Sequence, residues 1–325
     1  MRLLGVDIGA TKTEIALLDQ EGNILASHKI FSKEIFKKAS SPAVALTEHL
    51  LAFCQHIDVQ IHDLFGIGIG VPGDIDQNTH RIGTCPNLPI LNGLRLEPEL
   101  RQLLDAPVLI ENDVNLICYG EYKAGNGKRV EHLACLYVGT GIGCGLIIDG
   151  NLYTGADGAA GEVGHSILFP DGRQCNCGQK GCLEMYCSGK ALAGRAASVL
   201  SENYTQNDVR MGEEAVQWVD AEVLINAARS GHTKAIEELQ ISFYYLGLGV
   251  VNLVNLFNPR LVILGGGILD GWPEGIDIVS SVVRNHARSI VRDHLLIERP
   301  VLGARAGLVG ASFLLQDRVP SPSIP

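Results

Sequence analysis

The spacing of apolar residues predicts a chain in which strands and helices alternate. Short apolar runs bounded by Gly, Pro, Asn or Asp predict strands at 3–7, 13–18, 24–31, 64–69, 107–110, 133–138 and 260–264. Apolar positions three and four residues apart predict helices at 42–57, 112–120, 189–200, 221–230, 233–257 and 306–315. Only turns separate the first three strands, so we expect them to form a meander.

Two Gly-rich turns with the same local pattern are the first candidates for a ligand site. One strand runs into Asp7-Ile8-Gly9-Ala10-Thr11-Lys12-Thr13, and another runs into Gly139-Thr140-Gly141-Ile142-Gly143-Cys144-Gly145; in both places a second strand follows. This echo suggests duplicated α/β halves. Glycine lacks a Cβ, so several N–H groups can converge on phosphate oxygens, and a nearby Thr hydroxyl or Lys can add a contact.

A tight hairpin without a ligand would explain one such turn taken alone. The matched pair, together with Gly265-Gly266-Gly267, favours a nucleotide-phosphate site. A P-loop is excluded because its GxxxxGK[ST] spacing is missing, and a Rossmann site is excluded because a strand follows each turn. Asp7, at a strand end facing the first turn, is a candidate to orient Mg²⁺ through water.

Polar residues follow the strand predicted at 107–110. Glu111, Asn112 and Asp113 lie where a buried strand gives way to a helix, and α/β proteins usually bind ligands there. Helix capping would by itself explain Asn112 or Asp113. A hydroxyl that attacks a γ-phosphorus needs a carboxylate to accept its proton, and Asp113 is the best-placed candidate.

One histidine and three cysteines form the most distinctive cluster. His165 is followed by Cys175, Cys177 and Cys182, which matches a tetrahedral Cys₃His zinc site. Four protein ligands leave no open position, so the ion would be structural. Buried free thiols are the alternative, which the tight cysteine spacing disfavours.

Two carboxylates lie close to this cluster in the sequence. Glu162 precedes His165 by three positions, and Glu184 follows Cys182 by two. A metal that fixes His165 would also fix these carboxylates, which could then accept hydrogen bonds from the hydroxyls of a sugar. For each carboxylate taken alone, a solvated surface position is the alternative.

Composition narrows the classes to which the chain can belong. It has 325 residues, of which 46% are hydrophobic, and this length favours two domains. The formal charge of −10, without a cluster of Lys and Arg, argues against nucleic-acid binding. We find no secretory signal and no run of about 18 apolar residues, so no membrane span is expected. The nine cysteines then fit a reducing compartment, and we expect a cytoplasmic protein.

Together these motifs resemble the ROK family (repressors, open reading frames, kinases) of bacterial sugar kinases, across nearly the whole chain. Residues 7–13 resemble its first phosphate motif and 139–146 its second. The segment 161–165, the three clustered cysteines and Glu184 resemble its signature. The resemblance implies an actin-like ATPase fold (hexokinase-type, ribonuclease H-like), with two α/β domains flanking a cleft that holds the sugar.

The resemblance also implies roles for individual residues. Asp113 would be the catalytic base. The sugar would contact Asn87, Asn112, Asp113, Glu162, His165 and Glu184. One structural Zn²⁺ on His165, Cys175, Cys177 and Cys182 would hold the loop that carries the last three sugar contacts. The phosphates of ATP, with Mg²⁺, would lie against Asp7, Gly9, Ala10, Thr11, Lys12, Thr13, Gly139, Thr140, Gly141, Gly143, Gly145, Gly265, Gly266 and Gly267.

We expect a small α/β domain at 1–115, to which a helix at about 303–317 returns, a large α/β domain at 116–302 with the zinc loop, and a disordered tail at 318–325. Segments 170–173 and 188–192 resemble the glucokinase branch, which implies phosphorylation of a hexose, glucose first, at its 6-hydroxyl. Kinases of N-acetylglucosamine, N-acetylmannosamine or fructose, and polyphosphate as donor, are alternatives within the family.

A non-catalytic sugar sensor is the alternative from another class. A DNA-binding repressor is not expected, because repressors of this family carry a winged helix-turn-helix before the kinase core and the first strand here starts at Leu3. The expected partners are therefore a hexose and further copies of the chain, in a homodimer or homotetramer.

Overall fold

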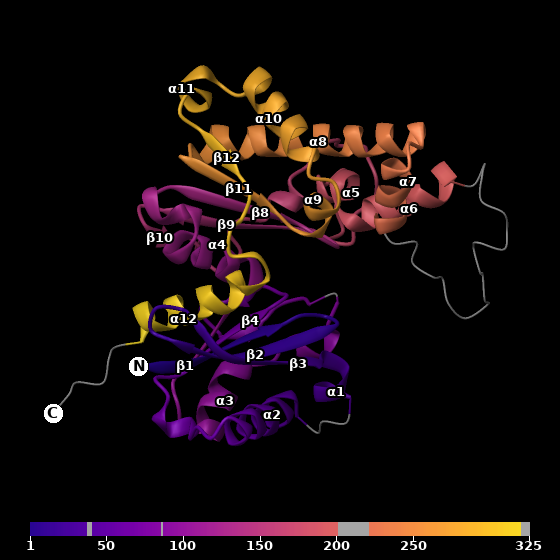
Figure 1. Ribbon diagram of the computed structural model, residues 1–325. Helices are drawn as coiled ribbons and strands as arrows, with labels where there is room; N and C mark the ends of the chain where they lie inside the picture. The colour runs from indigo at the N-terminus through magenta and orange to yellow at the C-terminus, as the bar shows by residue number, and fades with distance from the viewer. Residues whose placement is uncertain (38–40, 86, 201–220, 320–325) are drawn as a thin grey trace, which may run out of the picture. The chain divides into compact units, whose positions relative to one another are not determined.

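The computed structural model describes residues 1–37, 41–85, 87–200 and 221–319, which fall into two compact units (Figure 1). The first contains residues 1–134, 145–161 and the chain from 300 onward, and the second contains residues 135–144 and 162–299. The predicted boundary at residue 115 differs from this division. Helix α4 (Asp113–Ala124) belongs to the first unit, because it packs against α12 (Ala306–Arg318), the predicted returning helix. Residues 320–325 of the predicted tail lie outside the described part of the chain.

A five-stranded mixed sheet forms the centre of the first unit, with the order β3-β2-β1-β4-β7. Strands β1 (Arg2–Ile8), β2 (Lys12–Asp19) and β3 (Ile24–Phe31) form the predicted antiparallel meander. Strands β4 (Ile67–Val71) and β7 (Val108–Asn112) run parallel to β1. The carboxyl ends of β1, β4 and β7 therefore meet at one end of the sheet.

Helices cover both faces of this sheet. On one face α2 (Pro42–His56) and α3 (Leu96–Leu104) pack on a core that includes Leu46, Leu50 and Leu100, and α12 lies on the other face (Figure 1). The amphipathic α3 was not predicted from the sequence. The remaining named elements here are α1 (Ser32–Phe36), β5 (Ile75–Asp76) and β6 (Arg81–Ile82).

A second sheet has the order β10-β9-β8-β11-β12. Its strands are β8 (Leu133–Val138), β9 (Ile142–Ile148), β10 (Asn151–Leu152), β11 (Leu261–Gly265) and β12 (Leu296–Glu298). The helices of the second unit are α5 (Glu184–Cys187), α6 (Gly189–Leu200), α7 (Ala221–Arg229), α8 (Thr233–Phe257), α9 (Gly267–Gly271), α10 (Gly275–His286) and α11 (Ser289–Arg292). The predictions of α6, α7 and α8 are confirmed, whereas α9, α10 and α11 were not predicted.

Helix α8 is long and apolar enough to cross a membrane by length and composition alone. Of its most apolar window, 56% is buried inside the protein. It packs against α6, α7 and α10, and Phe243 and Leu246 lie in the resulting core. Such burial is the pattern of a core helix, so the length of α8 is weak evidence for a membrane span.

Helix α12 approaches its neighbours at backbone contact distance. A Cβ on Gly310 would overlap the carbonyl oxygen of Leu116 in α4, and a Cβ on Gly120 of α4 would overlap that of Ala306. On the sheet side, a Cβ on Gly68 of β4 would lie 2.6 Å from the oxygen of Ala311. Larger side chains would force these elements apart, so glycine is required at the crossings.

We predict that Gly310→Ala lowers the free energy of unfolding by about 1–3 kcal/mol, because the added methyl group overpacks the contact with α4. Gly194→Ala is the matched control, since Gly194 is also helical and nothing lies within 4 Å of its Cβ position. Gly194→Ala should raise the free energy of unfolding by up to about 1 kcal/mol, because alanine favours the helical conformation more than glycine does. Urea and thermal unfolding measure both variants, and equal stabilities would contradict the steric explanation.

Candidate active site

The first Gly-rich turn is a tight hairpin between β1 and β2. The N–H of Gly9 donates to the oxygen of Lys12 at 3.0 Å, and Ser32, the first residue of α1, donates its hydroxyl to the oxygen of Gly9 at 2.6 Å. The hydroxyl of Thr13 is fully buried, 3.0 Å from that of Ser32, so it braces the turn from inside. Ser32 was missed in the sequence because it lies 19 positions beyond the turn.

Two carboxylates lie at the carboxyl end of the parallel strands. Asp7 of β1 pairs with Gly70 of β4, which pairs with Glu111 of β7, and Asp113 begins α4 immediately after β7. A Cβ on Gly70 would lie 3.6 Å from Oδ1 of Asp7 and 3.7 Å from Cα of Asp113. The missing side chain of Gly70 therefore lets the two aspartates approach each other.

The electrostatics of this pair are unusual for aspartates. Burial, and secondly the charge of Asp7, raises the pKa of Asp113 to about 7. Burial, and secondly the charge of Glu14, raises the pKa of Asp7 to about 6. Both side chains keep partial exposure, so a substrate can reach them. A carboxylate with a pKa near neutrality accepts a proton efficiently when a reaction needs a general base.

Hydrogen bonds around Asn112 hold the start of α4. Its Oδ1 accepts from the N–H groups of Val114 at 2.9 Å and Asn115 at 3.0 Å, so the predicted capping of this helix by Asn112 is confirmed. Its Nδ2 donates to the oxygen of Gly73 at 3.3 Å. Capping and contact with a sugar are compatible, since a cap occupies only part of the side chain's hydrogen-bonding capacity.

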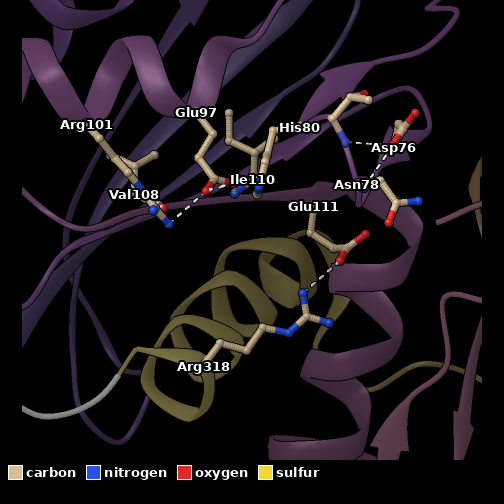
Figure 2. Close-up of polar contacts among 10 residues, drawn as sticks. Asp76, Asn78, His80, Glu97, Arg101, Val108, Ile110, Glu111 and Arg318 are labelled. Atoms are coloured by element: carbon tan, nitrogen blue, oxygen red, sulfur yellow. Dashed lines mark hydrogen bonds and ion pairs between the residues drawn. The ribbon is translucent and has the colours of Figure 1, made fainter. Parts of the chain in front are cut away.

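Glu111 is fully buried and supports the same segment. Its Oε1 accepts from the N–H of Asn112 at 3.0 Å and from Nδ2 of Asn115 at 3.1 Å. Its Oε2 lies 3.4 Å from Nη1 of Arg318, at the end of α12 (Figure 2). Arg318 thus supplies the opposite charge that a buried carboxylate needs. This partner was not predicted from the sequence because 207 positions separate the two residues.

The outer edge of β7 is held by side chains of α3. Glu97 accepts from the N–H of Ile110 at 3.3 Å, and Nε of Arg101 donates to the oxygen of Val108 at 2.9 Å (Figure 2). Glu97 and Arg101 also pair with each other at 2.7 Å. They fix the strand that leads into Asp113.

The second Gly-rich turn lies in the second unit, between β8 and β9. The N–H of Gly139 donates to the oxygen of Gly141 at 3.0 Å, and the N–H of Gly189, the first residue of α6, donates to the oxygen of Gly139 at 2.7 Å. The third Gly segment lies beside this turn, because a Cβ on Gly266 would lie 2.5 Å from the oxygen of Val138. Gly145 lies inside β9, where a Cβ would lie 2.5 Å from Cβ of Cys118, so packing alone requires glycine there.

The predicted metal ligands come together in the second unit. Their ligand atoms, on His165, Cys175, Cys177 and Cys182, all lie within 4.8 Å of one another. Sγ of Cys175 is 3.6 Å from Nδ1 of His165, and the Sγ atoms of Cys177 and Cys182 are 3.6 Å apart. Tetrahedral Zn–S bonds of about 2.3 Å place two sulfurs about 3.8 Å apart, so the cluster fits zinc.

The predicted site residues are divided between the two units. The first unit contains Asn87, Asn112, Asp113, Asp7, Gly145 and the turn 9–13. The second unit contains Glu162, His165, Glu184, the cysteine cluster, Gly139, Thr140, Gly141, Gly143 and the segment 265–267. Asn87 is exposed in a loop, and Nε2 of His165 lies 3.8 Å from Oε2 of Glu162.

Comparison with known proteins decides the family. The model of the ROK family matches residues 3–318. The chain belongs to the ROK family. It is 32% identical to a glucokinase of Streptomyces coelicolor, with 98% of each chain covered. It is also 30% identical to a xylose repressor of Bacillus subtilis, over 97% of this chain and 77% of the repressor.

A solved structure confirms the expected actin-like fold. The crystal structure of a ROK family glucokinase from Streptomyces griseus, in complex with glucose and AMPPNP, superposes with a TM-score of 0.77 and 31% sequence identity. The match covers 98% of this chain and all of that one. The ROK resemblance drawn from the motifs, and its proximity to the glucokinase branch, are therefore confirmed.

We predict that NMR titration of the aspartate carboxyl carbons will show Asp113 with a pKa of about 7. Asp7→Asn removes a negative charge that disfavours ionisation of Asp113, so the pKa of Asp113 should fall in this variant. Asp149→Asn is the control, because Asp149 is 82% exposed in a turn and its removal should leave that pKa unchanged. An unchanged pKa of Asp113 in Asp7→Asn would show that the two carboxylates do not interact.

Proposed function

We propose that this protein transfers the γ-phosphoryl group of ATP to the 6-hydroxyl of a hexose, with glucose as the preferred acceptor. The supporting observation is Asp113, a partly exposed carboxylate with a raised pKa at the start of α4, beside Asp7. This is the group that a kinase acting on alcohols needs in order to accept the hydroxyl proton. The likeness to glucokinases over nearly the whole chain supports the same reaction.

Each group of residues has one task in this proposal. Asp113 accepts the proton of the attacking hydroxyl, and Glu111 and Asn112 keep the start of α4 in place for it. The backbone N–H groups of the two Gly-rich turns bind phosphate oxygens. Asp7 orients a Mg²⁺ ion that neutralises charge on the phosphates. Asn87, Asn112, Glu162, His165 and Glu184 bind the hydroxyls of the sugar, as the family resemblance implies.

Zinc has a structural task. With His165, Cys175, Cys177 and Cys182 as its ligands, the ion has no open position for a substrate. It would hold the loop 162–184, whose two ends carry Glu162 and Glu184. We also propose a cytoplasmic location and a homodimer or homotetramer, with no nucleic acid or membrane among the partners.

A sugar-sensing regulator is the second candidate, because the chain matches a xylose repressor over 97% of its length. Such a protein would bind sugar through Glu162, His165 and Glu184 without turning over ATP. The presence of Asp113, with its raised pKa, favours the kinase.

An ADP-release assay tests the proposed function. The purified chain, with MgATP, is supplied with glucose, mannose, fructose, allose, N-acetylglucosamine or N-acetylmannosamine. A parallel series with polyphosphate in place of ATP is followed by formation of the sugar phosphate, because this donor releases no ADP. We expect the highest kcat/KM with glucose and ATP. If the chain binds sugar but releases no ADP with any of these sugars, the result would support the regulator instead.

We predict that Asp113→Asn lowers kcat by at least about 100-fold, because the amide cannot accept the proton. The side chain keeps its shape, so the glucose Kd measured by calorimetry should change little. Asp149→Asn serves again as the control and should keep normal kcat. Near-normal turnover of Asp113→Asn would exclude Asp113 as the base.

We predict about one zinc per chain in protein purified without added metal, measured by elemental analysis. Cys177→Ser should reduce this content and lower the melting temperature, because a structural zinc site contributes directly to folding stability. Cys54→Ser, at a cysteine outside the cluster, controls for the loss of a thiol and should keep the zinc. Active protein without zinc would contradict the zinc site.

A further inference from the structure

Glu184 contacts the second Gly-rich turn directly. Its Oε2 accepts a hydrogen bond from the N–H of Ile142 at 2.9 Å. A Cβ on Gly141 would overlap the same oxygen and would lie 3.2 Å from Cδ of Glu184. The carboxylate therefore lies against the peptide that joins Gly141 to Ile142, and the absence of a side chain on Gly141 makes room for it.

The residues after Glu184 hold the rest of this turn. The N–H of Gly189 donates to the oxygen of Gly139 at 2.7 Å, and the N–H of Lys190 donates to the oxygen of Thr140 at 3.2 Å. The segment 184–190 thus meets the turn at three hydrogen bonds. Movement of this segment would change the orientation of the N–H groups that the turn offers to a phosphate.

Ile142 also contacts the segment that carries two other proposed sugar ligands, Glu162 and His165. A Cβ on Gly164 would lie 2.6 Å from the oxygen of Ile142. Gly164 lies between Glu162 and His165 in the sequence. The N–H of Ile142 is therefore held by Glu184, while its carbonyl group lies against the loop of Glu162 and His165.

We propose that Glu184 is a positioning residue that couples the sugar site to the second phosphate turn, so that sugar and nucleotide increase each other's affinity. Its Oε2 is used by Ile142, while among the described residues no hydrogen bond to Oε1 is found, which leaves this oxygen for a hydroxyl of the sugar. A bound sugar would fix the carboxylate, and the carboxylate would fix the turn. The inference rests on the proposed sugar contact of Glu184.

Thermodynamic linkage makes this coupling reciprocal, since whatever factor sugar adds to nucleotide affinity, nucleotide adds to sugar affinity. The coupling can therefore be tested from both sides. A change in the sugar ligand Glu184 should alter nucleotide binding, and a change in the turn should alter sugar binding.

The first test measures binding of Mg·AMPPNP by calorimetry, without and with glucose. Glu184→Ala should weaken Mg·AMPPNP binding without sugar by about fivefold or more. It should also abolish the increase in Mg·AMPPNP affinity that glucose causes in wild type. Glu162→Ala is the matched control, because the side chain of Glu162 is 49% exposed and its Oε2 lies 3.8 Å from Nε2 of His165. It should lower glucose affinity while sugar-free nucleotide affinity stays within about twofold of wild type.

The conservative variant Glu184→Gln separates positioning from general damage. Its amide oxygen can still accept from Ile142, so Mg·AMPPNP affinity without sugar should return towards wild type. Loss of one charged oxygen should still lower glucose affinity. Equal sugar-free Mg·AMPPNP affinities in wild type, Glu184→Ala and Glu162→Ala would overturn the coupling.

The second test starts from the turn. Gly141→Ala should displace the carboxylate of Glu184 and lower glucose affinity measured without nucleotide by about fivefold or more. Gly194→Ala is the control, because Gly194 has no role in the proposed site and nothing lies within 4 Å of its Cβ position. Its glucose affinity should equal that of wild type, and equal glucose affinities in both variants would overturn the coupling.

The two possible failures are distinguishable. Wild type that binds neither Mg·AMPPNP nor glucose would contradict the proposed function. Wild type that phosphorylates glucose, with no difference between the Glu184 and Glu162 variants in Mg·AMPPNP binding, would contradict only the coupling. Zinc content and melting temperature show whether each variant is folded. If Glu184→Ala or Gly141→Ala does not fold, the Glu184→Gln variant provides the test. A glucose affinity of Glu184→Gln equal to that of wild type would then contradict the proposal.

Discussion

The candidate base depends on the close crossing of two helices. Glycine at 120 and 310 lets α4 and α12 pack backbone against backbone, and α12 is held against the sheet at Gly68. Asp113 is the first residue of α4, so this packing helps to fix where its carboxylate lies relative to β1 and β4. These glycines take no part in the proposed reaction, but their close packing sets the position of the residue proposed to act as the base.

Three acidic residues, Asp7, Glu111 and Asp113, lie at this end of the sheet, and they differ in burial and in their partners. Glu111 is fully buried but has Arg318 and two amide donors as partners. Asp113 and Asp7 are partly exposed and have raised pKa values, and the charge of Asp7 contributes to the shift at Asp113. Charge compensation at Glu111 makes it suited to a structural role, whereas the aspartate pair, with its raised pKa values, is suited to proton transfer and to attracting a cation.

Much of this structure could be predicted from local sequence patterns, whereas the features that depend on long-range contacts could not. The meander, both Gly-rich turns and the cap at Asn112 follow from a few adjacent residues, as does the gathering of the cysteines around His165. Helix α3 was missed although its three buried leucines are spaced four residues apart, because the element has only nine residues and contains a proline, Pro98, in its first turn. The roles of Ser32 and Arg318 depend on contacts across the chain, which no local spacing encodes.

The cover over the edge of β7 has a consequence for how the protein behaves at high concentration. A strand at the edge of a sheet normally has a row of unpaired amide and carbonyl groups. A strand of another molecule can pair with these groups, and sheets extend into aggregates in this way. Here Glu97 and Arg101 satisfy the N–H of Ile110 and the oxygen of Val108 with charged groups. These two backbone groups of the strand that leads to the candidate base are thereby unavailable for intermolecular pairing, and α3 protects this part of the edge from aggregation.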